Sequence, residues 1–271
     1  MRKFFLASLF LPMFFSLPAN AQPVRIMPFG DSITYDDHHG DTRPAGLRGG
    51  YRFYLYYLLK DRNYQFDFVG SVRAGYDIIP PFDPDNEGHP GKDATFLGNH
   101  VYEYLMLNPA NIMLVHVGTN HSSDLVYELN AMQHLLDEID RFEADYGISI
   151  RVILALIIPR ENDVFIPQFN YMLNIMAQTR IAQGDNIVIV DMYHDAGLTE
   201  DDWSDGTHPN DKGYEKMAKV WLNPILLKRK DSLYLFSTQL VKRKYILSAT
   251  VDEKSGISTV ETTIPDDGIR F

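Results

Sequence analysis

The sequence predicts an α/β fold: a flavodoxin-like three-layer α/β/α sandwich around a five-stranded parallel sheet. Short apolar runs alternate along the chain with longer segments whose apolar residues recur every three or four positions, as on one face of a helix. The later apolar runs are nearly continuous in Val, Ile and Leu, which is typical of strands covered by helices on both faces. Strands that alternate with helices are joined by right-handed crossovers and form a doubly wound sheet.

Each predicted element follows from one of these two patterns. The five predicted strands are residues 25–29, 66–69, 111–117, 151–158 and 186–192. The predicted helices are residues 51–60, 96–107, 125–142, 167–183 and a last one from about 210 to 228. In such a sheet, ligands bind beyond the carboxyl ends of the strands, so we expect the functional residues there.

One long loop interrupts the alternation after the first strand. Residues 35–50 are too polar and Gly-rich for a helix. The Asp and His side chains between Asp36 and Asp41 include oxygen and imidazole groups that bind divalent metals in other proteins. A solvated loop explains them without a ligand, and we expect no metal.

The two ends of the chain are expected to lie outside the main domain. Arg2 and Lys3 precede the uncharged apolar residues 4–17, and Ala19-Asn20-Ala21 has the pattern of a signal-peptidase site. The apolar run is shorter than the ~20 residues that span a bilayer, which disfavours the alternative of a membrane anchor. We therefore predict a signal peptide over residues 1–21 and an exported protein without stable membrane association.

The remainder divides into residues 22–230, one domain, and residues 231–271, a short β-rich C-terminal extension. The extension is predicted from three runs rich in β-branched residues. These runs are residues 233–240, 245–251 and 258–264.

Composition excludes several functions. The 271 residues include 25 Lys and Arg against 36 Asp and Glu, a formal net charge of −11, which argues against binding nucleic-acid phosphates. Loss of the leader removes two basic residues and no acidic ones, so the mature chain is more acidic still. Without cysteine the chain has no disulfide, thiolate nucleophile or Cys-bound zinc.

Two segments have the residue types of a serine nucleophile and its base. Ser32 directly follows the first predicted strand, in Gly30-Asp31-Ser32-Ile33. Asp205 and His208 lie three residues apart before the last predicted helix, a spacing that lets a carboxylate orient an imidazole. Each segment alone is explained as well by a turn or a helix start.

Two further segments end predicted strands and supply hydrogen-bond donors. They contain Gly70, after the second strand, and Asn120, after the third. Acyl transfer creates an oxyanion that needs several fixed donors, and the backbone N–H of Gly70, the Asn120 amide and the N–H of Ser32 are suitable groups.

Together these segments resemble the four blocks of the SGNH, or GDSL, hydrolases. The matching residues occur in the same order, over about residues 25–228: Gly30-Asp31-Ser32-Ile33, Gly70, Gly118-x-Asn120 and Asp205-x-x-His208. Within the family the chain most resembles the acetyl xylan esterases of carbohydrate esterase family 3. That narrower likeness lies in residues 26–28, 49–52, 67–71, 86–91 and 205–208. The third block continues with His121, where many members have Asp.

The resemblance implies a serine hydrolase that needs no metal or organic cofactor. Ser32 would attack the ester, His208 would act as base and Asp205 would orient His208. Ser32, Gly70 and Asn120 would form the oxyanion hole.

Other conspicuous residues have two interpretations. Glu87 and His89 either form the rim of a substrate pocket or belong to a plain turn. Trp203 either stacks on a sugar or packs beneath the catalytic loop. His116, inside a strand, is more typical of a hydrogen-bonded core histidine than of a base.

We therefore expect a secreted esterase that removes short acyl groups, O-acetyl in particular, from carbohydrate. No large apolar insertion for a long acyl chain is evident, which favours short acyl groups. The partner would be an acylated small molecule or polysaccharide. A lysophospholipase or thioesterase is the first alternative. A non-catalytic carbohydrate-binding protein is the second, and the intact Ser32, Asp205 and His208 argue against it. The oligomeric state is left open.

Overall fold

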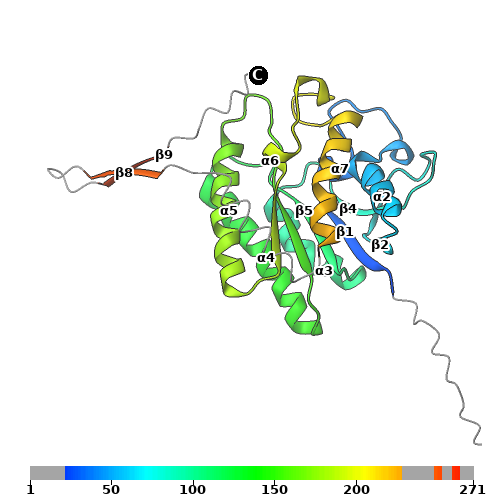
Figure 1. The fold of residues 1–271 in the computed structure, drawn as a ribbon, viewed down its shortest axis with the longest axis horizontal. Helices are drawn as coiled ribbons and strands as arrows, with labels where there is room; N and C mark the ends of the chain where they lie inside the picture. Colours follow the sequence, from blue (N-terminus) through cyan, green and yellow to red (C-terminus); the bar gives the residue numbers. More distant parts are fainter. Residues whose placement is uncertain (1–21, 228–246, 252–257, 263–271) are drawn as a thin grey trace, which may run out of the picture.

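The computed structural model describes residues 22–227, 247–251 and 258–262, and its centre is a sheet of seven strands (Figure 1). The strands lie in the order β3-β4-β1-β5-β6-β7, and β2 pairs with β1 beside this path. Their bounds are β1 Val24–Gly30, β2 Phe66–Phe68, β3 Val72–Arg73, β4 Asp85–Gly88, β5 Ile112–His116, β6 Arg151–Leu156 and β7 Ile187–Asp191.

The five predicted strands are all present and run parallel, but the sheet has seven strands and not five. The additional strand β4 pairs in parallel with the end of β1, where Gly30 faces Gly88, and β3 pairs antiparallel with β4. Sequence patterns missed β4 because its four residues, Asp85–Gly88, have no apolar alternation. Two-residue β3 is too short to form a pattern.

The five predicted helices are also present, together with two helices of four residues, α1 and α6. Their bounds are α1 Ser32–Tyr35, α2 Gly50–Asp61, α3 Ala94–Leu107, α4 Leu125–Tyr146, α5 Phe165–Gln183, α6 Met192–Asp195 and α7 Asp211–Leu226. Asp93, Asp124 and Asn210 each accept a backbone N–H of the first turn that they precede, which fixes where α3, α4 and α7 begin. The predicted loop between α1 and α2 contains only one turn of 3₁₀ helix, Ala45–Leu47.

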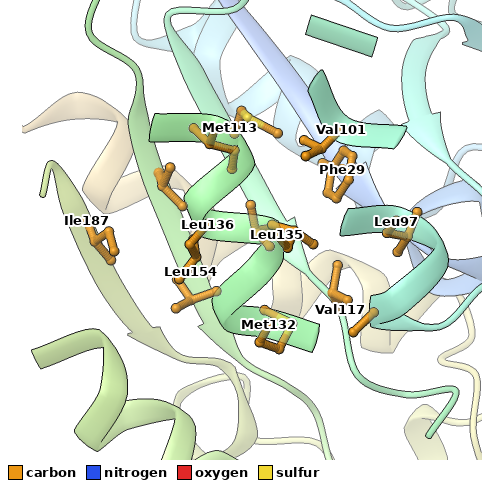
Figure 2. Close-up of a cluster of buried hydrophobic side chains, with 14 of the residues drawn as sticks. Phe29, Leu97, Val101, Met113, Val117, Met132, Leu135, Leu136, Leu154 and Ile187 are labelled. Carbon is orange, nitrogen blue, oxygen red and sulfur yellow. The ribbon is translucent and has the colours of Figure 1, made fainter. Parts of the chain in front are cut away.

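Helices α3, α4 and α5 cover one face of the sheet, and α2 and α7 cover the other. Alternate residues of each strand supply the two cores, because successive side chains of a strand point to opposite faces. Figure 2 shows part of the first core, in which Phe29 of β1 and Met113 of β5 pack with Leu135 of α4. In the second core, Tyr51 of α2 and Trp221 of α7 are fully buried, and their ring centroids are 5.8 Å apart. The predicted three-layer sandwich is therefore confirmed.

Part of the C-terminal extension is described. Strands β8, Leu247–Val251, and β9, Ser258–Thr262, form an antiparallel pair, in agreement with two of the three predicted runs. The predicted strand 233–240 and the predicted signal peptide lie outside the described residues, so the division into leader, domain and extension stays a prediction. No helix among the described residues is both long and apolar enough to cross a bilayer.

The first core predicts a large difference between two positions on α4. Leu135 is fully buried, so Leu135→Ala should lower the free energy of unfolding by about 2–5 kcal/mol, through lost burial and the cavity that remains. Val126 is 67% exposed, and Val126→Ala should change the free energy of unfolding by no more than about 0.5 kcal/mol. Urea unfolding measures both, and equal losses would contradict the assignment of this helix face to the core.

Candidate active site

Ser32 lies where β1 passes into α1, at the carboxyl edge of the sheet. A Cβ atom on Gly30 would lie 2.3 Å from the carbonyl oxygen of His116, so only glycine allows β1 to approach β5 this closely just before the serine. The side chain of Asp31 accepts the N–H of Ile33 and begins the short helix α1. Ser32 itself is 7% exposed, so its hydroxyl is held in a largely enclosed position.

The structure brings Ser32, His208 and Asp205 together. Ser32 Oγ is 2.9 Å from His208 Nε2, and His208 Nδ1 is 2.9 and 3.0 Å from the two carboxylate oxygens of Asp205. An ionised carboxylate only accepts, so Nδ1 bears the proton and Nε2 accepts the serine O–H. This is the arrangement in which an imidazole can remove a proton from a serine hydroxyl.

Three backbone N–H groups hold the Asp205 carboxylate. Oδ1 accepts from Thr207 and His208 at 2.7 Å, and Oδ2 accepts from His39 at 3.0 Å. Partial burial raises the pKa of Asp205, but the N–H groups of His208 and Thr207 and the His208 ring outweigh it and lower this pKa from 3.8 to about 2. Asp205 therefore stays ionised wherever His208 can act as a base.

Gly70 and Asn120, the predicted oxyanion-hole residues, follow β2 and β5. A Cβ atom on Gly70 would lie 2.0 Å from the carbonyl oxygen of Asn86 in β4, so a side chain here would displace the backbone. Three hydrogen bonds link Asn120 to the end of β1. Asn120 Nδ2 donates to the Lys92 carbonyl at 3.1 Å, Lys92 N–H to the His89 carbonyl at 3.2 Å, and His89 N–H to the Gly30 carbonyl at 2.9 Å.

Glu87 is not at the surface, as a residue on the rim of a substrate pocket would be. It is fully buried in β4, and its carboxylate accepts from Ser71 N–H at 2.7 Å, from Ser71 Oγ at 2.6 Å and from His89 Nε2 at 2.6 Å. This burial argues against direct contact with substrate. Glu87 instead fixes the turn that follows Gly70.

His89 and Trp203 differ in how they relate to the site. The His89 side chain is 19% exposed and stacks on Tyr104, with ring centroids 4.8 Å apart, so it stays a candidate for the rim of the pocket. Trp203 packs against the core between α2, α7 and the sheet, and its backbone pairs with that of Pro209. These contacts favour the interpretation of Trp203 as a support beneath the catalytic loop.

His116 is a core histidine, as its place in the strand predicts. It is fully buried, and its Nε2 accepts the N–H of Ile158 at 3.3 Å. Burial lowers the pKa of His116 from 6.5 to about 3, so its ring is neutral at ordinary pH.

The acidic loop after α1 is held by arginines. Arg43 binds both Asp36 and Asp41, at 2.9 and 2.8 Å, and Arg48 binds Asp37 at 2.6 Å. In the described part of the chain, no group of three or more Asp, Glu or His side chains is arranged to hold a metal ion. Ion pairs therefore account for the acidic residues of this loop.

A family model described as GDSL-like lipase/acylhydrolase matches residues 26–221 of the sequence, which contain all four blocks described above. The chain belongs to this family. The match covers both the sheet and the loops that hold Ser32, Asp205 and His208.

Solved structures similar to this GDSL family member include two carbohydrate esterases of family 3. One, from Clostridium thermocellum, is 26% identical, with a TM-score of 0.61, and the match covers 74% of this chain and 94% of that one. The other, from Talaromyces cellulolyticus, is 25% identical, with a TM-score of 0.64 and coverage of 77% and 99%. A variant of an acetyl esterase, solved with an acetate ion, is also 25% identical, with a TM-score of 0.63 and coverage of 77% and 99%.

A multidomain esterase of Ruminococcus flavefaciens is 29% identical over 243 residues. This match covers 79% of the GDSL chain but only 30% of the longer protein. The likeness therefore concerns one part of that esterase.

Arg52 is a residue of this GDSL domain whose role the sequence did not reveal. Its guanidinium is fully buried and donates to five backbone carbonyls, those of Thr34, Tyr35, Arg48, Ala74 and Pro84, at 2.8–3.3 Å. The arginine lies within a predicted helix, where an exposed position is the usual expectation. Arg52 therefore joins three parts of the chain: the end of α1, the residues just before α2, and the loop between β3 and β4.

Asp31 is the second such residue, directly before Ser32. It is fully buried, and its Oδ2 has no hydrogen-bond partner among the described residues. Burial raises the pKa of Asp31 from 3.8 to about 6, against the lowering effect of the Ile33 N–H. At neutral pH the protein thus holds a poorly solvated negative charge beside Ser32.

This charge predicts that the effect of Asp31→Asn on stability depends on pH. The pKa of Asp31 is higher in the folded than in the unfolded chain, so its contribution to stability is complete below pH 3.8 and is lost as pH rises to about 6. Relative to wild type, the free energy of unfolding of the variant should therefore rise between pH 4 and 7. The shift of the pKa from 3.8 to about 6, at about 1.4 kcal/mol per pKa unit, limits this rise to about 3 kcal/mol.

Urea unfolding at several pH values measures this difference. The matched control is Asp93→Asn, which changes the cap of α3 at a partly exposed position and should show no comparable rise. A difference between Asp31→Asn and wild type that stays constant from pH 4 to 7 would contradict the prediction.

Proposed function

We propose that this GDSL family member is an esterase that removes short acyl groups, acetyl in particular, from carbohydrate through a Ser-His-Asp acyl-enzyme mechanism. One observation carries the proposal: the hydrogen-bonded series from Ser32 Oγ through His208 to Asp205, with a Ser–His distance of 2.9 Å. A chain whose only function is binding has no need of a base that accepts the proton of an enclosed serine hydroxyl.

The first half of the reaction forms the acyl-enzyme. His208 Nε2 takes the hydroxyl proton as Ser32 Oγ bonds to the ester carbonyl carbon, and the carbonyl electrons move onto oxygen. The N–H groups of Ser32 and Gly70 and the second N–H of the Asn120 amide stabilise that oxyanion. When the carbonyl re-forms, the bond to the alcohol breaks and His208 gives its proton to the leaving oxygen.

The second half returns the enzyme to its starting state. A water molecule loses a proton to His208 Nε2 and attacks the acyl carbon, and the same donors stabilise the second oxyanion. Breakdown releases the carboxylic acid, and the proton returns to Ser32 Oγ. Asp205 stays ionised throughout and stabilises the imidazolium that forms twice in each cycle.

The substrate class is inferred from similar proteins. Two of the similar structures are family 3 carbohydrate esterases and a third is an acetyl esterase, and they are matched over 94–99% of their chains. We infer an acylated sugar or polysaccharide as the substrate. The predicted leader, if cleaved, would place the enzyme outside the cytoplasm, where such polymers are found.

The proposal predicts that Ser32→Ala abolishes ester hydrolysis. The rate with p-nitrophenyl acetate should fall by more than about 10⁴-fold, because the nucleophile is removed while the fold is kept. His134→Gln, an exposed change on α4, is a control that should hydrolyse at the wild-type rate. Equal rates for Ser32→Ala and wild type would refute the serine mechanism.

The acyl and alcohol groups can be tested separately. Acetate release from acetylated xylan is compared with hydrolysis of p-nitrophenyl esters of two, four and eight carbons. We expect acetate release from the polymer and a rate that falls with chain length. A preference for the eight-carbon ester would favour a lipid hydrolase while leaving the triad in place.

The proposed oxyanion hole predicts that Asn120→Ala mainly lowers kcat. Loss of one donor should reduce kcat by about 10²–10³-fold, and KM should change little because the donor acts on the transition state. Steady-state kinetics with p-nitrophenyl acetate measures both constants. A rise in KM at unchanged kcat would assign Asn120 to substrate binding instead.

A further inference from the structure

We propose that His121 is a positioning residue: held as an imidazolium between Ser122 and Asp163, it fixes the loop that presents Asn120 to the reacting ester. This inference rests on the proposed function of Asn120 in the oxyanion hole. His121 directly follows Asn120 and is a second histidine beside the site, distinct from the base His208.

Both ring nitrogens of His121 face oxygen acceptors. Nδ1 is 2.8 Å from the carbonyl oxygen of Ser122, and Nε2 is 2.9 Å from Oδ2 of Asp163. The side chains of His121 and Asp163 are each 11% exposed, so water has limited access to the pair. The ring therefore takes part in two hydrogen bonds at once, of which the one to Asp163 is partly buried and the one to Ser122 is exposed.

A neutral imidazole has one donor and one acceptor, so it cannot satisfy both contacts. A carbonyl oxygen has no hydrogen to donate. Partial burial raises the pKa of Asp163, but the hydrogen bonds from His121 and the Phe165 N–H lower it overall, so this group is a carboxylate. Two acceptors require two donors, and the ring that fits them is the imidazolium.

His208 shows the opposite arrangement. One of its nitrogens also faces a carboxylate, that of Asp205, but the other faces a hydroxyl, which can donate. That partner allows a neutral ring, as a general base requires. The two histidine–aspartate pairs thus differ in the group on the far side of each ring, which is a carbonyl oxygen for His121 and a hydroxyl for His208.

Contacts around His121 connect three active-site loops. The ring stacks on Phe165 of α5, with centroids 4.0 Å apart and planes at 12°. Asp163 Oδ1 accepts the Phe165 N–H at 2.8 Å and so fixes the start of the same helix. In the loop between β6 and α5, Glu161 N–H donates to the Gly206 carbonyl at 2.8 Å, between Asp205 and His208. The ion pair therefore holds the Asn120 loop to a segment that also contacts the catalytic loop.

Few other charges act on this pair in the described residues. Arg160 lies 3.8 Å from Asp163 on its own loop, and Glu128 of α4 accepts the Ser122 N–H at 2.7 Å. Asp163 also acts on Tyr193 of α6, whose pKa is raised mainly by burial.

The proposal predicts that His121→Gln mainly lowers kcat. A glutamine amide has its N–H donors on a single atom, so it cannot donate to both the Ser122 carbonyl and the Asp163 carboxylate, and the loop that presents Asn120 is held less firmly. In this variant kcat should fall by about tenfold with KM changed less than twofold.

Two measurements test this. Nitrogen-15 NMR of the histidine rings in the unmutated protein at pH 7, assigned by comparison with both His121→Gln and Asp163→Asn, should show both His121 nitrogens protonated. Steady-state kinetics with p-nitrophenyl acetate compares kcat and KM of wild type, His121→Gln and Asp163→Asn with those of the control His134→Gln. If His121→Gln fails to fold, Asp163→Asn and the NMR of the unmutated protein still decide.

A neutral His121 ring at pH 7, or a His121→Gln variant with the kcat of wild type, overturns this inference alone. The proposed function fails in a different way, through equal rates for wild type and Ser32→Ala. The rates of His121→Gln and Ser32→Ala, each compared with wild type, therefore distinguish failure of the His121 inference from failure of the proposed function.

Discussion

The pairing of β1 with its neighbours is the constraint on which the rest of the site depends. This seven-residue strand pairs with β2 and then β4 on one edge, and with β5 on the other. Its last residue, Gly30, lies opposite Gly88 of β4 and His116 of β5. The segments that follow β1, β4 and β5 therefore meet beside Ser32. A one-residue shift of β1 would turn its core side chains to the opposite face and move the serine away from His208.

Polar groups are buried around this point at a cost in stability that the packed cores offset. Asp31, Arg52 and Glu87 are all fully enclosed, and two of them have their charge satisfied by several partners. Asp31 has fewer partners, and it lies next to Ser32, the proposed nucleophile. Functional regions often retain such unfavourable groups, because the geometry that the chemistry needs is not the most stable one.

Much of the fold and the triad could be predicted from sequence because both depend on residue type and spacing. Apolar periodicity identifies the buried strands and helices, and the chemistry of acyl transfer limits which residues can replace Ser32 or His208. Strand β4 was missed because its polar side chains form hydrogen bonds instead of packing. Arg52 and Glu87 were missed or misplaced for a related reason: burial of a charged residue depends on partners distant in the sequence, which no local pattern shows.

The buried guanidinium of Arg52 has a consequence for how this domain can vary. Its five acceptors come from four segments of the chain: the end of α1, the residues before α2, and the two ends of the loop between β3 and β4. An insertion in any one of these segments would move a carbonyl away and leave a buried donor unmatched, which costs about 1–3 kcal/mol. Related proteins that keep this arginine should therefore differ in length on the other side of the site, in the loops that follow β5 and β6.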